Sequence, residues 1–142
     1  MPGIVVGIDG STGSHPALRW AAKEAADRHA PLTVLTVHQT AVSFWTGSSA
    51  INPADKSMEE TEQKLLEEAT LKVTSQLDSQ PASVTVKTAS GGIAHELISA
   101  AKDADLLVVG TRGGGGFGSL RLGSVSSQVV GHAPCPVVVV PS

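Results

Sequence analysis

The stretch VVGTRGGGGFGSLRLGSVS, residues 108–126, joins an apolar run to an amphipathic segment through a loop rich in glycine. The apolar run begins at Leu106, seven glycines occur from Gly110 to Gly123 inclusive, and Ser124 opens the amphipathic segment. A short apolar run, a glycine cluster and a serine at a helix start predict a strand, a loop and a helix in that order.

The glycines of this loop favour an anion site. Glycine reaches positive φ and lets the backbone approach a ligand without a Cβ in the way. A helix start presents unpaired N–H groups and a partial positive charge, and the two features together suit a phosphate. A flexible surface loop would have a similar composition. Because the glycines lie between a strand and a serine-led helix, we favour phosphate binding.

The composition describes one folded domain, residues 1–142, with 41% hydrophobic residues. The 10 Lys and Arg residues against 13 Asp and Glu give a net charge of −3, which argues against nucleic acid as a main partner. No apolar run approaches the roughly 18 residues that cross a bilayer, and no secretion signal is evident. We therefore expect a cytoplasmic protein without a membrane partner. Cys135, the single cysteine, is expected to be a buried, inert thiol.

Short apolar runs alternate with amphipathic segments along the whole chain, which predicts an α/β protein with a parallel sheet and right-handed crossovers. Strands are expected at residues 4–8, 32–37, 83–88, 106–109 and 136–140. Helices are expected at residues 14–29, 57–77, 93–101 and 124–131. Ligands of such sheets bind beyond the carboxyl ends of the strands, where the winding direction reverses. Asp9 and Gly110 both lie at the carboxyl ends of expected strands and therefore at the same end of the sheet. The sequence pattern alone does not fix the order of the strands.

Two common phosphate motifs do not fit. A Walker loop requires a lysine, and none follows Lys102. Gly113-x-Gly115-x-x-Gly118 matches the dinucleotide pattern by count, but it neither follows the first strand nor opens a helix.

The spacing that fits is Gly110, two residues, Gly113, nine residues, then Gly123-Ser124. With it the chain resembles the universal stress protein family, in its ATP-binding branch, whose hallmark is Gly-x2-Gly-x9-Gly-Ser/Thr. The resemblance also covers VVGIDGS at 5–11, Ala17-Leu18-x-Trp20-Ala21, ADLLVVG at 104–110, and the tripeptides GSV at 123–125 and CPV at 135–137. It implies a Rossmann-like open sheet of five parallel strands in the order 3-2-1-4-5, with helices on both faces. It also implies a homodimer formed through the final strand, Val137 to Val140.

The resemblance assigns a set of nucleotide contacts by position. The set is Ile8, Asp9, Val37, Gly110, Arg112, Gly113, Gly123, Ser124, Val125 and Ser126. The glycines and residues 124–126 would hold the ribose and phosphates, chiefly through backbone N–H groups and serine hydroxyls. Ser124 can cap the helix and still donate its O–H outward. The backbone of Val37 would contact the adenine edge, while its side chain is expected in the core.

Other residues of this region leave alternatives open. The carboxylate of Asp9 would repel phosphates, so it would meet ribose hydroxyls or a bridging Mg²⁺, unless an Asp-Gly turn uses it locally. Arg112 and Arg121 could each pair with a phosphate or be ordinary exposed arginines. Phe44 and Trp45 could cover the adenine or pack elsewhere.

Together these features predict a small dimeric nucleotide sensor. ATP, with Mg²⁺, would order the loop from Gly113 to Gly123 and so expose or hide a surface for a protein partner. A slow ATPase or nucleotidyl-transfer enzyme using Asp9 with a metal is the alternative from the enzyme class. Metalloprotease spacing, a nucleophile elbow and a lysine for phosphoryl transfer are all lacking in the sequence. Cyclic AMP in place of ATP, and a dimer that has lost nucleotide binding, are the remaining alternatives.

Overall fold

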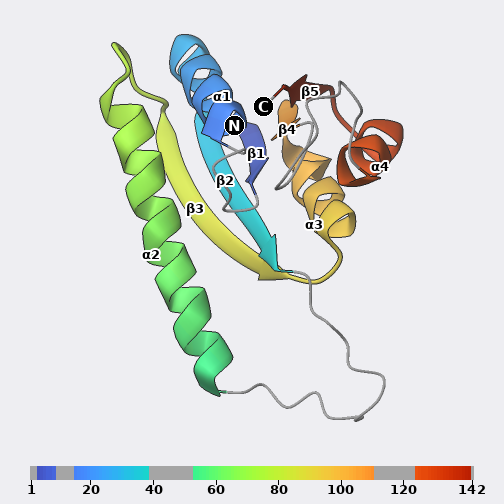
Figure 1. Ribbon diagram of the computed structural model, residues 1–142. Coiled ribbons are helices and arrows are strands. Elements are labelled where there is room, and N and C mark those ends of the chain that lie inside the picture. Colours follow the sequence, from blue (N-terminus) through green and yellow to red (C-terminus); the bar gives the residue numbers. More distant parts are fainter. Residues whose placement is uncertain (1–2, 9–14, 39–52, 111–123, 142) are drawn as a thin grey trace.

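The structure is a computed structural model that describes residues 3–8, 15–38, 53–110 and 124–141 (Figure 1). Its strands are β1 (Ile4–Ile8), β2 (Pro31–His38), β3 (Ser83–Ser90), β4 (Leu106–Gly110) and β5 (Val137–Val140). Its helices are α1 (His15–Arg28), α2 (Pro53–Ser75), α3 (Ile93–Ala100) and α4 (Ser124–His132), with a short 3-10 helix, η2 (Ala101–Asp103), after α3.

The five strands form one sheet in the order β3-β2-β1-β4-β5, and each neighbouring pair is parallel. The expected strand order is therefore confirmed. From β1 the chain winds outward through β2 to β3, and it then returns to the other side of β1 as β4. The reversal of winding lies between β1 and β4, which is where ligands of open parallel sheets bind.

Two hydrophobic clusters, one on each face, explain why the central strands are apolar without alternation. Ile4 and Val6 of β1 belong to the cluster that α1 and α2 cover, whereas Val5 belongs to the cluster with α3 and α4. Successive side chains of a strand point to opposite faces, so a strand covered on both sides is buried along its whole length. Figure 1 shows α2 running alongside β3 and α3 next to α4.

Several element boundaries differ from the expectation. Helix α2 begins at Pro53 instead of residue 57, because proline at the first helical position loses no hydrogen bond. The same helix ends at Ser75, where Gln76 and Leu77 donate their amides to carbonyls three residues earlier. The turn between β3 and α3 passes through Gly91 with φ of +142°, a conformation that glycine adopts without strain.

The two edges of the sheet differ. At the β3 edge, the side-chain amide of Gln63 in α2 donates to the carbonyl oxygen of Val86 at 2.9 Å. Val86 packs, partly buried, against the core, whereas Val84 on the same outer strand is 42% exposed. At the other edge, all four valines of β5 are half-buried.

None of the helices in the described ranges is both long enough and apolar enough to span a bilayer.

Candidate functional site

The site begins where β1 and β4 stop pairing. Their register runs through Ile4↔Leu106, Val5↔Leu107 and Val6↔Val108 and goes no further, although β1 continues to Ile8 and β4 to Gly110. On its other side β1 stays paired with β2 through Ile8↔Thr36. The last two residues of β1 and β4 are thus no longer paired with each other, at the point where the winding reverses.

The last carbonyl of β1 is held by a neighbouring hydroxyl. The Oγ1 of Thr36, on β2, donates to the carbonyl oxygen of Ile8 at 2.6 Å. Thr36 is only 7% exposed, so its hydroxyl lies where an unpaired polar group would be costly. This bond therefore fixes the end of β1 against the end of β2.

The last carbonyl of β4 has a similar partner. The Oγ of Ser126, in the first turn of α4, donates to the carbonyl oxygen of Gly110 at 2.5 Å. Ser126 is 4% exposed, and the bond holds the start of α4 at the end of β4. A serine hydroxyl has a single proton, so while it donates to Gly110 it cannot also donate to a phosphate. The donors that remain are the amides of the first helical turn, which have no partner within the helix.

Two of the expected contact residues have side chains that pack against the core. The side chains of Val37 and Val125 both pack, partly buried, against the cluster beneath α3 and α4. For Val37 this agrees with the expectation of a core side chain. Their backbone groups are therefore the parts that a ligand could use.

Four members of the expected set lie at the carboxyl-terminal end of the sheet, on β1, β2, β4 and α4. They are Ile8, Val37, Gly110 and Ser126. Four other members of the expected set, Asp9, Arg112, Gly113 and Gly123, lie outside the described residues, as do Phe44, Trp45 and Arg121. Ser124 is the first residue of α4, but its side chain is outside the description.

Sequence reasoning missed Thr36. The sequence does contain a signal that the Thr36 side chain is buried. Thr36 follows Leu32 and Val34 at intervals of two, so the three side chains point to the same covered face of the strand. A buried hydroxyl almost always has a hydrogen-bond partner. The partner could not be named until the register placed Ile8 beside Thr36.

Side chains that commonly bind metal ions do not cluster within the described residues. Within the described ranges, no three His, Cys, Asp or Glu side chains gather closely enough to hold an ion. Mg²⁺ commonly binds through one or two carboxylates together with phosphate oxygens of a ligand. The carboxylate that the sequence analysis proposes for this purpose is that of Asp9, which lies outside the described residues.

Cys135 lies away from the site, near the beginning of β4. Its side chain is half-buried instead of fully buried, because it precedes the edge strand β5. Burial raises the pKa of the Cys135 thiol, with a smaller opposing effect from a backbone hydrogen bond at Leu107 and a further increase from the charge of Asp105. A raised pKa leaves less thiolate at neutral pH, which agrees with the expected low reactivity.

The sequence matches the Universal stress protein family over residues 2–141. A universal stress protein of Mycolicibacterium smegmatis is 37% identical over 97% of this chain and 47% of its own length. One of Mycobacterium tuberculosis is 36% identical over the same shares. The chain thus spans about half the length of these curated relatives.

Solved structures share the fold. The universal stress protein UspA from Lactobacillus plantarum is 25% identical with a TM-score of 0.78, covering 98% of this chain and 97% of that one. A universal stress protein in complex with cAMP is 22% identical with a TM-score of 0.69, covering 99% and 96%. The protein from Archaeoglobus fulgidus in complex with dAMP is 21% identical with a TM-score of 0.65, covering 99% and 98%.

Proposed function

The chain belongs to the universal stress protein family, and from this premise we propose that it forms one domain that binds an adenine nucleotide between the ends of β1 and β4. The observation that carries the proposal is the end of the β1–β4 ladder at Val6↔Val108, two residues before either strand ends. The start of α4 is hydrogen-bonded to this position through Ser126 and Gly110. An anion there would face helix-start amides and a favourable helix dipole.

The adenine nucleotide is supported from two directions. The spacing of Gly110, Gly113 and Gly123-Ser124 is the hallmark of the ATP-binding branch. Two proteins of the same fold are complexes with cAMP and dAMP, which share the adenine base and a phosphate. ATP is our first candidate, and cyclic AMP is the second because of the cAMP complex.

Each residue of the expected set has a part in this proposal. Gly110, Gly113, Gly123 and residues 124–126 hold ribose and phosphates, mainly through backbone N–H groups. Ile8 and the backbone of Val37 border the base, and Arg112 pairs with a phosphate. Asp9 binds the ribose hydroxyls or a Mg²⁺ ion that the triphosphate also coordinates.

Isothermal titration calorimetry with ATP and MgCl₂, and separately with cyclic AMP, tests the proposal. We expect one ATP site per chain, and we expect Gly123→Val to abolish it by adding a side chain where the motif needs backbone approach. Gly131→Ala is the matched control, because a Cβ there meets nothing within 4 Å. Tighter binding of cyclic AMP would favour the second candidate, and no heat with either nucleotide would overturn the proposal.

The same proposal includes a ligand-dependent dimer through β5. Gly110 of β4 is paired with Val140 of β5. A nucleotide that contacts Gly110 can therefore affect the position of β5, the strand at the open edge of the sheet. Leu107 donates its amide to the carbonyl of Pro136, and backbone groups alternate sides along a strand. The amides of Val137 and Val139 therefore point away from β4, where a second chain can pair with them.

Sedimentation velocity with and without ATP tests the dimer. Val139→Pro removes one outward N–H at a position where an edge strand tolerates proline, and it should weaken dimerisation. Val139→Thr keeps both the N–H and the β-branched shape, and it should dimerise like the wild type. Equal dimerisation of both variants would contradict pairing through β5, and a dimer unaffected by ATP would contradict the switch.

A further inference from the structure

The structure places a buried hydroxyl on the last carbonyl of each strand that borders the reversal of winding. Thr36 Oγ1 donates to Ile8 at the end of β1, and Ser126 Oγ donates to Gly110 at the end of β4. The two donors come from different elements, since Thr36 belongs to β2 and Ser126 to α4. Both carbonyls lie just past the end of the β1–β4 ladder.

We propose that Thr36 and Ser126 are paired positioning residues that prepare the ends of β1 and β4 for the phosphates of the nucleotide. The inference rests on the proposed function and adds a residue, Thr36, that the family motif does not include. Neither hydroxyl needs to touch the ligand. Each acts through the carbonyl that it holds.

Two physical effects follow from such a bond. A carbonyl oxygen carries partial negative charge and would repel a phosphate, and a donated hydroxyl offsets that charge. A trans peptide is planar, with its N–H opposite its C=O, so fixing the carbonyl also fixes the peptide that leads out of the strand. The orientation of the last carbonyl of β1 and of β4 is therefore set before a ligand arrives.

A merely structural role for the hydroxyls makes a different prediction. Thr70 is a matched reference, because it is 2% exposed and its Oγ1 donates to the carbonyl oxygen of Leu66 at 2.7 Å within α2. Removing that hydroxyl also leaves a buried carbonyl with one partner fewer. If the Thr36 hydroxyl only supports folding, Thr36→Val and Thr70→Val should have the same consequences.

The experiment measures ATP affinity in the presence of MgCl₂ by calorimetry for folded wild type, Thr36→Val, Ser126→Ala and Thr70→Val, alongside urea unfolding of each. Thr36→Val and Ser126→Ala should each weaken binding by about tenfold, the equivalent of one hydrogen bond. Thr70→Val should shift the urea midpoint but leave affinity within about twofold of wild type. Thr36→Ser and Ser126→Thr keep a hydroxyl and should restore affinity.

The outcomes separate the two proposals. If wild type binds ATP and Thr36→Val binds it with the same affinity, this inference is overturned but the proposed function is not. Wild type that binds no nucleotide removes both. If Thr36→Val does not fold, Thr36→Cys replaces it, since a thiol is a much weaker donor than the hydroxyl of Thr36→Ser. Equal affinity of those two variants would then overturn the inference.

Discussion

Gly7 of β1 lies directly against Leu97 of α3. A Cβ placed on Gly7 would come within 2.5 Å of Leu97 Cδ2, much closer than ordinary van der Waals contact. Leu97 is itself buried, in the cluster that joins α3 and α4 to the sheet. The missing side chain at Gly7 is therefore what allows α3 to pack close to the strand whose end borders the site.

Replacing this glycine should destabilise the protein, and the same replacement in α4 should do the opposite. We expect Gly7→Ala to lower the free energy of unfolding by about 1–3 kcal/mol, because Leu97 must move within a packed core. We expect Gly131→Ala to raise it by up to about 1 kcal/mol, because alanine is the better helix former and its Cβ meets open space. Urea unfolding of both variants measures the difference, and two changes of the same sign would contradict the packing described here.

His29 terminates α1 in a conformation that favours glycine. Its φ is +54°, and the amides of His29 and Ala30 donate to the carbonyls of Ala26 and Ala25 at 3.1 and 2.8 Å. We expect His29→Gly to raise the free energy of unfolding by about 0.5–1 kcal/mol, because it relieves the steric cost of positive φ. Thermal unfolding measures this, and a lowered midpoint would count against the strain.

Lys23→Gly is the control for that substitution. Lys23 is exposed in the middle of α1, where glycine costs roughly 1 kcal/mol relative to a good helix former.

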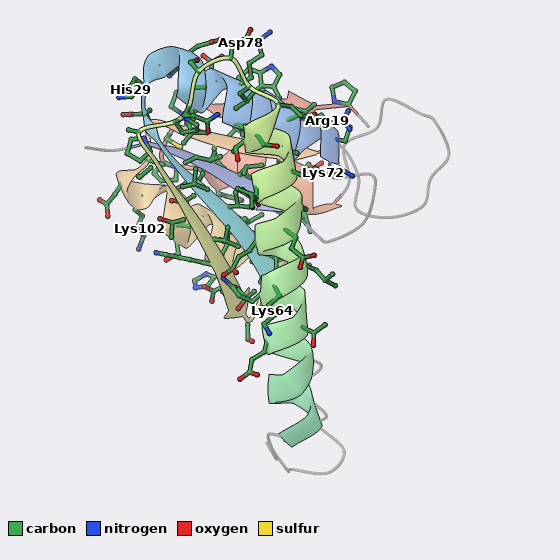
Figure 2. The ribbon with its side chains drawn as sticks, turned by 90° about the vertical axis from the view of Figure 1, so that its left-hand side faces the viewer. Arg19, His29, Lys64, Lys72, Asp78 and Lys102 are labelled. Atoms are coloured by element: carbon green, nitrogen blue, oxygen red, sulfur yellow. The ribbon has the colours of Figure 1, made fainter. Side chains whose placement is uncertain are left out.

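Figure 2 shows His29 and Asp78 at the end of the molecule opposite the strand arrowheads. We therefore expect nucleotide affinity to be the same in His29→Gly and in wild type.

The thiol of Cys135 should react slowly at neutral pH. Because burial raises its pKa, the thiolate fraction at any pH below that pKa is smaller than for an ordinary thiol. We expect iodoacetamide to modify Cys135 more slowly than glutathione at neutral pH, with a rate that rises as the pH becomes alkaline. Mass spectrometry follows this single site directly, and a rate equal to that of glutathione at neutral pH would contradict the raised pKa.

Asp9 is the expected link between the nucleotide and Mg²⁺. We expect Asp9→Asn to weaken ATP binding roughly tenfold when MgCl₂ is present, the scale of one charge-assisted contact. In EDTA Asp9→Asn should bind ATP at least as tightly as wild type, because the carboxylate then has no ion to share with the phosphates and only repels them. Calorimetry under both conditions provides the comparison. A loss of equal size in EDTA would instead place Asp9 on the ribose.

Much of the fold could be predicted from local patterns. The apolar runs at β1 and β4 predict buried strands, and each strand is covered on both faces. In α1 the apolar residues Leu18, Ala21 and Ala25 recur at helical spacing, and this pattern predicts the face that is buried. The start of α2 was misplaced because the pair Asn52-Pro53 suits a loop as well as a helix start. Strand order does not follow from such patterns, since it depends on pairing between distant segments.

The candidate site follows less completely from the sequence. Glycine spacing directs the prediction to the segment after β4, because glycine lets a backbone approach a ligand without a Cβ in the way. Thr36 carries no such motif, and its role becomes visible only when the register sets its hydroxyl beside the carbonyl of Ile8. The hydrogen bond from the Ser126 hydroxyl to the carbonyl of Gly110 likewise becomes visible only in the structure, and the nucleotide contact expected of Ser126 stays a prediction.

The central claim is that a nucleotide binds where β1 and β4 part. A titration of ¹⁵N-labelled protein with ATP and MgCl₂, followed by amide chemical shifts, tests it most directly. We predict that the changes concentrate at Ile8, Val37, Gly110 and Ser126. The amides of Ala82 and Asp105, which bond across the opposite end of the sheet, should stay unchanged. Shifts confined to that opposite end, or no shifts at saturating ATP, would contradict the account.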